Sequence, residues 1–543
     1  MKALLAAALL CAGTAAVAQE AAPPSTPAPA TRPKLIVVIS VDQFSADLFA
    51  QYRNHFTGGF ARLLTGAVFP SGYQSHAATE TCPGHSTILT GMRPARTGIV
   101  ANNYIDQSVA RPDKTVYCAE NETVPGSTHT SYTVSDRHLL VPTLGERMKT
   151  ADPRTRVVSV AGKDRAAVMM GGHKVDELWW WDGKRFSSYA GRAEPAVVTR
   201  ANAAVGALVA AAQAPLPLPG YCRPLDRPVT VGGQTLGQGR FAREPGDETA
   251  FRASSAADAA VFALAAGLIQ SMNLGKGPAT DIIDIGASAT DYIGHTYGTQ
   301  GTEMCIQMAE LDRTLGDFFD QLDRFGVDYE VALTADHGGH DLTERQQQRA
   351  MPGERRVAAD TSATAVGKTI GAQFGLTGPV LLAAEGDVYV DRALSPANRA
   401  RVQTEAVRRF RAFPDVAAVF TRGELADAPT PSGPPENWTL LERARASFNA
   451  DRSGDFIVLL KPRVNGIAKP GPGYVATHGS PWDYDRRVPI LFWRRGMTGF
   501  EQPLSVETVD IAPTLAATIG FPLAGVDGRC LDLDPGPASS CGR

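Results

Sequence analysis

The segment Ala78–Thr87 (ATETCPGHST) holds a threonine that is placed well for phosphate chemistry. Pro83 suits the first turn of a helix, which puts Thr81 at the helix N-terminus. Free backbone N–H groups and the positive end of the helix dipole favour a phosphate there. A threonine hydroxyl is a weak nucleophile unless a base or a metal activates it. Thr81 could also be only the N-cap residue of that helix, so its role depends on the rest of the chain.

Three aspartates and three histidines elsewhere in the chain could bind the metal that activates this threonine. Imidazole nitrogens and carboxylate oxygens suit Zn²⁺, and two ions with three protein ligands each would both keep an open position. Two ions about 4 Å apart can stabilise the attacking and leaving oxygens of a phosphoryl transfer. Each residue taken alone could be an ordinary turn, cap or loop residue. The six candidates are Asp42, Asp291, His295, Asp336, His337 and His478.

A basic pair and an amide are candidates for binding the phosphate. Lys163 and Arg165 follow the apolar run Val157–Ala161, and side chains two residues apart on an extended chain point to the same side. Arginine can bind phosphate oxygens in a bidentate manner, and lysine adds a point charge. Asn102 could donate its amide to another oxygen. The alternatives are a solvated basic pair and a turn asparagine.

The elements that must position these residues form an alternating pattern. Continuous apolar, β-branched runs are typical of buried parallel strands, and helical patterns lie between them. The predicted fold is α/β, a large, mostly parallel sheet sandwiched by helices. Ligands bind at the carboxyl ends of such strands, where several candidates lie. The predicted strands are Lys34–Val41, Val157–Ala161, Asp281–Gly286, Tyr329–Thr334 and Val488–Trp493, and the predicted helices are Pro142–Lys149, Ala256–Asn273, Gly301–Leu322 and Val509–Ile519.

Two regions depart from this pattern within a catalytic domain predicted over residues 33–543. Residues near 176–250 contain three consecutive tryptophans and a Pro/Gly-rich stretch, which indicate an irregular insertion. Residues near 345–455 predict a smaller α+β cap. Its predicted elements are the strands Asp387–Val390 and Val416–Phe420 and the helix Pro396–Phe413.

The N-terminus predicts export. Lys2, the apolar run Ala3–Ala16 and the motif Ala16-Val17-Ala18 have the features of a cleaved secretory signal over residues 1–18. Residues 19–32 are rich in Pro and Ala and predict a disordered linker. We therefore expect a periplasmic or secreted protein. The net charge of −3 over 543 residues gives no electrostatic reason to expect nucleic acid or an anionic membrane as a partner.

Cleavage of the signal would leave six cysteines. An even number in an exported protein permits disulfides, but sequence does not determine their pairing. Cys530 and Cys541 are the favoured pair because they are close together in a polar tail. No CxxC pair is present, which disfavours a cysteine zinc site. The six are Cys82, Cys118, Cys222, Cys305, Cys530 and Cys541.

Between Lys34 and about Gly520 the chain resembles the alkaline phosphatase superfamily, and within it the monomeric, threonine-nucleophile enzymes of PafA type. Thr79–His85 resembles the nucleophile motif, with Thr81 as the attacking residue. Other segments are similar to the phosphate-binding motifs, the three zinc motifs and the start of the C-terminal helix. These segments are Gly98–Asn103, Gly162–Arg165, Asp291–His295, Thr334–Gly339, Thr477–Ser480 and Val509–Thr514.

The resemblance implies hydrolysis of small phosphate monoesters at alkaline pH by a monomeric phosphoric monoester hydrolase. It implies a covalent phosphothreonine on Thr81, release of inorganic phosphate, and substrate binding by Asn102, Lys163 and Arg165. We expect no third, magnesium site, because Lys163 and Arg165 would place positive charge near it. The implied ligands are Asp291, His295 and His478 for one zinc, and Asp42, Asp336, His337 and Thr81 for the other.

Three alternatives to this function remain. A nucleotide pyrophosphatase/phosphodiesterase would share the threonine, the asparagine and the six ligands, and Lys163 and Arg165 argue against it. A sulfatase would need a Cys-x-Pro-x-Arg pattern, whereas Pro83 follows Cys82 directly here. A binding protein with structural zinc would need closed sites of four protein ligands, whereas three ligands for each ion leave both sites open.

Overall fold

A computed structural model of the chain describes residues 32–349, 351–536 and 539–542. The predicted signal at 1–18 and nearly all of the predicted linker at 19–32 lie outside the described residues. The chain from Pro33 onward forms one unit.

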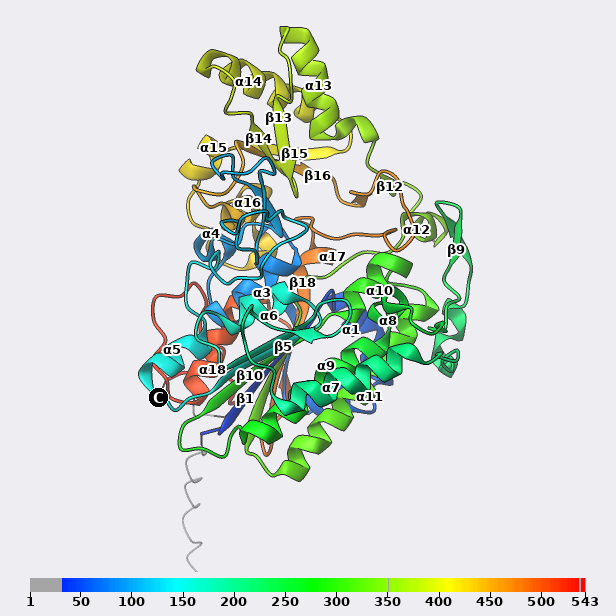
Figure 1. The fold of residues 1–543 in the computed structure, drawn as a ribbon, viewed down its shortest axis with the longest axis vertical. Helices are drawn as coiled ribbons and strands as arrows, with labels where there is room; N and C mark the ends of the chain where they lie inside the picture. The colour runs from blue at the N-terminus through cyan, green and yellow to red at the C-terminus, as the bar shows by residue number, and fades with distance from the viewer. Residues whose placement is uncertain (1–31, 350, 537–538, 543) are drawn as a thin grey trace, which may run out of the picture. The chain divides into compact units, whose positions relative to one another are not determined.

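The described part of the chain contains a ten-stranded sheet, which lies between helices in the lower half of Figure 1. The strand order is β19-β2-β18-β11-β1-β10-β5-β6-β7, and β20 also pairs with β2. The five neighbours from β11 to β6 are parallel, as predicted, whereas β18 is antiparallel to both β11 and β2. The bounds are β1 Leu35–Val41, β2 Ala67–Tyr73, β5 Val157–Ala161, β6 Glu177–Trp181, β7 Phe186–Ser187, β10 Asp281–Ala287, β11 Tyr329–Thr334, β18 Arg487–Arg494, β19 Phe500–Glu501 and β20 Val506–Glu507.

Strand β1 shows why the central strands are apolar at every position. Leu35, Val37 and Ile39 pack into the core on one face of the sheet, and Ile36 and Val38 pack into a second core on the other face. Because helices cover both faces, neither side of the strand meets water. The helices that supply the first core are α1 Ala46–Tyr52, α2 Gly59–Leu63, α7 Ala196–Ala210, α8 Glu248–Arg252, α9 Ser255–Met272, α10 Ala289–Tyr297 and α11 Thr302–Phe325.

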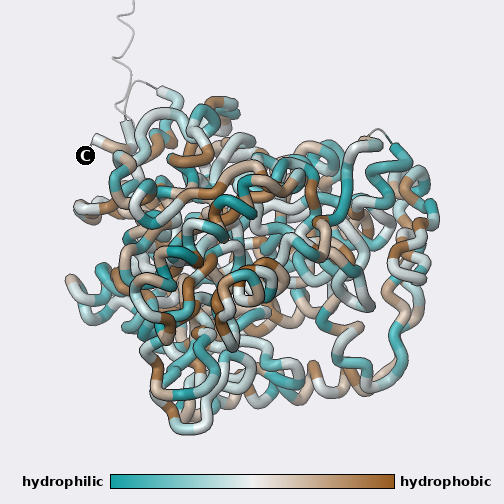
Figure 2. The backbone as a smooth tube through the Cα atoms, turned by 90° about the horizontal axis from the view of Figure 1, so that it is seen from above, coloured by the Kyte–Doolittle hydropathy of each residue, from teal (hydrophilic) through white to brown (hydrophobic). Residues whose placement is uncertain are grey.

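The other face is covered by α3 Thr81–Thr90, α5 Leu144–Ala151, α6 Asp164–Gly171 and α18 Ile511–Thr518. The four helices predicted from periodicity appear as α5, α9, α11 and α18, with small shifts at their ends. Helix α9 is long and apolar enough to cross a membrane, but it is more than half buried and packs against α7, α11 and β10. Figure 2 shows hydrophobic segments distributed through the described part of the chain, as expected for a core built from many short elements.

The tryptophan-rich segment is part of the central sheet. Trp179 and Trp181 point into the first core, and Trp180 points to the opposite side. The prediction of irregular structure is therefore wrong there, because bulky aromatic residues on both sides of β6 fit a strand that is covered on both faces. The same region contains α7 and the hairpin of β8 Val229–Val231 and β9 Gln234–Leu236.

The cap region contains a separate antiparallel sheet in the order β13-β14-β16-β15, drawn at the top of Figure 1. Helices α13 and α14 pack on it around a core of their own. The helix and both strands predicted for the cap are present, and the sheet continues to Leu460. The bounds are α13 Ala363–Phe374, β13 Leu381–Ala384, β14 Asp387–Val390, α14 Pro396–Ala412, β15 Val416–Thr421 and β16 Phe456–Leu460.

The remaining elements are short and lie in connecting segments. They are α4 Pro94–Thr97, β3 Asn103–Ile105, β4 Thr115–Tyr117, α12 Thr343–Arg349, β12 Arg355–Arg356, α15 Arg422–Asp427, α16 Leu440–Ser447, β17 Val464–Asn465 and α17 Asp483–Arg486, with 3-10 turns at Arg53–His55, Gly220–Leu225, Ala359–Thr361, Pro435–Asn437 and Thr508–Asp510.

Three disulfides join the six cysteines of the described chain. Cys530 pairs with Cys541, as predicted. The pairs Cys82–Cys118 and Cys222–Cys305, which sequence left open, link segments 36 and 83 residues apart.

Candidate active site

The predicted ligands gather at the carboxyl ends of three adjacent strands. Asp42 follows β1 directly, Asp291 lies in the first turn of α10 just after β10, and Asp336 follows β11. Since these strands are parallel neighbours in the sheet, their ends bring together residues that are far apart in the sequence. His478 comes from the loop between β17 and α17.

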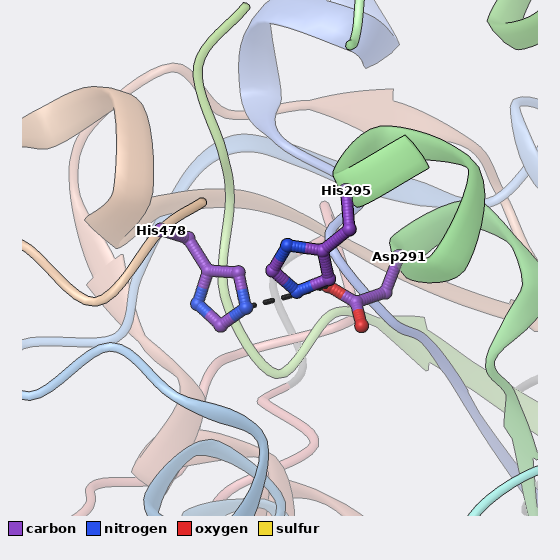
Figure 3. A group of neighbouring side chains, drawn as sticks. All are labelled: Asp291, His295 and His478. Carbon is purple, nitrogen blue, oxygen red and sulfur yellow. Dashed lines mark ion pairs between the residues drawn. The ribbon is translucent and has the colours of Figure 1, made fainter. Parts of the chain in front are cut away.

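Asp291, His295 and His478 form the first ligand group (Figure 3). Asp291 and His295 are four residues apart on α10 and share one face of it. Asp291 Oδ1 lies 3.3 Å from Nε2 of His295 and 3.3 Å from Nε2 of His478. Burial opposes ionisation of Asp291, but His295 and Lys163 outweigh it and hold the pKa of this carboxyl well below its usual value. Burial lowers the pKa of His295 to about 4, so its ring is neutral at pH 7.

The second group contains Asp42 and Asp336, together with a histidine that the sequence argument missed. His85 lies between the two carboxylates, 3.4 Å from Asp42 Oδ1 through Nε2 and 3.3 Å from Asp336 Oδ2 through Nδ1. Ligand atoms of these three residues lie within 4.8 Å of one another. The predicted His337 is also present, with Nε2 at 3.2 Å from Asp336 Oδ2. His85 could have been found from its motif, because it is four residues after Thr81 on the same helix.

All four histidines are oriented in the same way. In each ring, Nδ1 donates a hydrogen bond to a backbone carbonyl, at 2.7–2.8 Å. This bond fixes the tautomer of a neutral ring and leaves the lone pair of Nε2 free, as in histidines that bind metals. The pairs are His85 with Thr81, His295 with Ala476, His337 with Gly338, and His478 with Thr79.

The second group also contains buried polar atoms without a hydrogen-bond partner among the described residues. Such atoms are costly in a folded protein, and a cluster rich in carboxylate oxygens and imidazole Nε2 atoms fits a bound cation. Burial disfavours charge on His85, yet Asp336 and Asp42 outweigh it and raise the pKa of the ring, so this position favours a positive charge. The atoms without a hydrogen bond in the described chain are Asp42 Oδ1, Asp336 Oδ2, Nε2 of His85 and of His337, and Thr81 Oγ1.

Gln43 and Lys163 connect the two groups. The backbone N–H of Gln43 donates to Asp336 Oδ1 at 3.1 Å, and its side chain donates to Asp291 Oδ1 at 3.0 Å. Lys163 Nζ lies 3.0 Å from Asp42 Oδ2 and 2.5 Å from Asp291 Oδ2. Burial disfavours the ammonium, but Asp291 and Asp42 outweigh it and raise the pKa of Lys163. The two ligand groups therefore form one continuous site.

Thr81 is the first residue of α3, and the N-cap is Glu80, which makes no side-chain capping bond. Thr81 is therefore not the N-cap residue of this helix. The Asn102 side chain accepts a hydrogen bond from the Cys82 N–H at 2.8 Å through Oδ1, so its NH₂ group remains a donor. The Asn102 N–H donates to Glu80 at 2.7 Å, which holds Asn102 beside the start of α3.

Arg165 is placed by a network of tyrosines. Its Nη1 donates to the Tyr117 hydroxyl at 3.3 Å, and Tyr117 in turn donates to Asp164 at 2.8 Å. The disulfide Cys82–Cys118 joins the residue after Thr81 to the residue after Tyr117. Thr81, Asn102 and Arg165 are thus held in one covalent and hydrogen-bonded framework.

Comparisons with known proteins identify the family of the chain. The family model described as type I phosphodiesterase/nucleotide pyrophosphatase matches residues 36–481. The chain is 58% identical over 520 residues to alkaline phosphatase PhoK of a Sphingomonas species, which covers 94% of this chain and 93% of that protein. It is 48% identical over 517 residues to alkaline phosphatase PhoD of Zymomonas mobilis, covering 94% and 89%.

A solved structure supports the fold over nearly the whole chain. The crystal structure of wild-type alkaline phosphatase PafA superposes with a TM-score of 0.80 at 25% identity, covering 93% of this chain and 99% of that one. The PafA sequence of Elizabethkingia meningoseptica is 28% identical over 536 residues, covering 92% of this chain and 95% of that protein. The chain therefore belongs to the type I phosphodiesterase/nucleotide pyrophosphatase family within the alkaline phosphatase superfamily, and it is an alkaline phosphatase-type hydrolase of phosphate esters.

Proposed function

We propose that the chain hydrolyses phosphate monoesters at alkaline pH through a covalent phosphothreonine on Thr81, with two zinc ions as cofactors. The observation that carries the proposal is the buried Thr81 hydroxyl, which has no hydrogen-bond partner among the described residues. Thr81 is the first residue of α3, which begins beside the two ligand groups. Its helix also supplies His85, and the carbonyl of Thr79, two residues before it, orients His478.

The donor set supports zinc. Three of the predicted ligands are histidines and three are aspartates, the mixture that zinc takes in catalytic sites. Two bound zinc ions would lower the pKa of the threonine hydroxyl and stabilise charge on the phosphoryl oxygens. The first ion would be held by Asp291, His295 and His478, and the second by Asp42, Asp336, His337 and Thr81.

The reaction that we propose has two displacements at phosphorus. Thr81 Oγ gives up its proton to water and forms a bond to phosphorus as the bond to the ester oxygen breaks, and the leaving alkoxide takes a proton from water to become the alcohol. Water then attacks the phosphothreonine, which releases inorganic phosphate and restores the hydroxyl. Asn102, Lys163 and Arg165 would hold the phosphoryl oxygens during both steps through charge-assisted hydrogen bonds.

The basic pair favours monoesters over diesters. A phosphate monoester is a dianion in alkaline solution, so two adjacent cations attract it strongly. A diester carries only one negative charge, and its second organic group needs space beside the phosphate. A solved variant of PafA changes one threonine to serine and one asparagine, one lysine and one arginine to alanine. The same four residue types stand here at Thr81, Asn102, Lys163 and Arg165, which supports their assignment to one site.

We also propose export to the periplasm or medium, as a monomer. Three disulfides in the described chain support an oxidising compartment.

The decisive experiment compares kcat/KM for an aryl phosphate monoester and the matching diester at pH 7 and pH 9, with and without chelator. We expect the monoester to be preferred, with higher activity at pH 9 and none after chelation.

Lys163→Ala with Arg165→Ala should lower monoesterase activity by about 100-fold or more, since two charge-assisted contacts are lost, and should lower diesterase activity far less. Arg200→Ala is the control, because Arg200 is exposed on α7. An equal loss for both substrates would contradict the assignment.

A further inference from the structure

A pocket of about 530 Å³ opens beside Lys163 and Arg165. Its volume is within the range of about 300–1,000 Å³ that is usual for small-molecule sites. Its walls include the aromatic rings of Trp180 and Tyr292 and the side chain of Arg252 from the end of α8. An ester whose phosphoryl group is held by Lys163 and Arg165 would therefore have its organic part next to this space.

Arg252 is an exposed cation that the protein does not neutralise. Its guanidinium lies over the Tyr292 ring, 4.5 Å from the ring centroid, and Lys163 Nζ lies 4.9 Å from the same centroid. The guanidinium makes no hydrogen bond or ion pair with any residue in the described ranges 32–349, 351–536 and 539–542. Both distances are measured to the same ring centroid, so the Lys163 and Arg252 charges can be no farther apart than the sum of the two distances. Two phosphoryl groups of one small molecule can lie that far apart.

The two carboxylates that line the pocket are already engaged. Asp164 accepts hydrogen bonds from the hydroxyls of Tyr117 and Tyr132, both at 2.8 Å. Asp182 accepts from backbone N–H groups of the turn that follows it. Their oxygens are therefore turned toward protein donors, whereas Arg252 keeps its donors for a ligand. The pocket thus presents unused positive charge beside the proposed phosphate site.

We infer that this pocket binds a second anionic group of the substrate, so that the enzyme favours phosphate monoesters that carry a further phosphate. The inference rests on the proposed function. Arg252 is the residue that determines this preference, because a guanidinium can form two parallel hydrogen bonds to a phosphate. Tyr292 holds the guanidinium in place through a cation–π contact.

The test uses the zinc-loaded enzyme with fructose 1,6-bisphosphate and fructose 6-phosphate, and compares the ratio of their kcat/KM values. Arg252→Gln should lower the ratio of bisphosphate to monophosphate by about 5- to 10-fold, chiefly through KM, because one charge-assisted contact is lost. Arg252→Lys should restore part of it. Arg200→Gln is the matched control, because Arg200 is exposed on α7 and does not line the pocket. It should leave the ratio at the wild-type value.

The outcomes separate the inference from the proposed function. If wild-type enzyme hydrolyses both sugars and Arg252→Gln leaves the ratio unchanged, the second-anion site is wrong and the phosphatase assignment stands. A fall in the ratio that Arg200→Gln reproduces would also overturn the site, because it would show only a long-range charge effect. If the wild-type enzyme releases phosphate from neither sugar but cleaves diesters, the proposed function itself fails.

Discussion

Single side chains set the chemistry of the site, and His85 shows how. Its ring lies between Asp42 and Asp336 while Nδ1 is bonded to the carbonyl of Thr81. It therefore couples the position of the threonine to that of two proposed metal ligands. Through these contacts His85 would orient the second ligand group, and groups in that position commonly affect metal affinity by about 10- to 100-fold.

We expect His85→Gln to weaken binding of the proposed zinc by about 10- to 100-fold while the fold is retained. The measurement is residual activity and bound zinc across a series of chelator concentrations. His55→Gln is the control, because His55 is exposed and belongs to neither ligand group. Wild-type chelator sensitivity in His85→Gln would show that His85 does not support the metal site.

Residue types and spacing were enough to propose six ligands, because Asp and His after apolar runs stand out in the sequence. They did not reveal His85, which reads as part of a helix. Nor could they show that Lys163 contacts Asp42 and Asp291, because those contacts depend on the order of three strands.

At the scale of elements, the approach of α3 to the end of β11 places Thr81. Gly84 permits this approach, since a Cβ there would lie 1.9 Å from the carbonyl oxygen of Asp336. The end of β11 and the first turn of α3 can therefore be adjacent only with glycine at this position.

Gly84→Ala should push α3 away from Asp336, destabilise the protein by about 1–3 kcal/mol and reduce kcat. Gly206→Ala is a matched control, because Gly206 lies within α7 with nothing within 4 Å of the added Cβ. That change should stabilise the protein by about 0.5–1 kcal/mol. Urea unfolding and kcat measure both variants, and an active, fully stable Gly84→Ala would refute the packing argument.

Strand β11 also carries a buried acid that makes stability depend on pH. Burial raises the pKa of Glu330 from 4.5 to about 7. The folded state therefore binds the proton more tightly than the unfolded state, and stability is lost as pH rises from about 4.5 through 7. We expect Glu330→Gln to remove about 2–3 kcal/mol of the difference in unfolding free energy between pH 5 and pH 8. Urea titrations at both pH values test this, with exposed Glu244→Gln as control; an unchanged difference would contradict it.

Most elements were predictable because their apolar periods are long and clear, as in β1 and α11. The direction of β18 was not, since its apolar run is compatible with either orientation. The strand β6 was missed because three tryptophans and nearby prolines looked irregular, although tryptophan has a high strand propensity.

At the scale of the whole molecule, long loops are fastened to the core by covalent links. The disulfide Cys222–Cys305 ties the region before β8 to α11 across 83 residues. The sequence predicted a site at strand ends and a separate cap region, because both follow from the order of elements. The two long-range disulfide pairs could not be predicted, because they depend on how distant segments come together.

The disulfide Cys82–Cys118 has a consequence for the timing of enzyme maturation. It lies next to Thr81 and is buried, with both cysteines at most 1% exposed. With the export proposed above, the chain is made in a reducing cytoplasm and lacks this link there. We therefore expect the newly synthesised precursor to be inactive and to leave the cell's own phosphate esters intact before export. Residues 19–543 produced in reducing and in oxidising cytoplasm, then zinc-loaded and assayed with thiol counts, should differ in kcat. Equal activity of the fully thiol form would refute this latency.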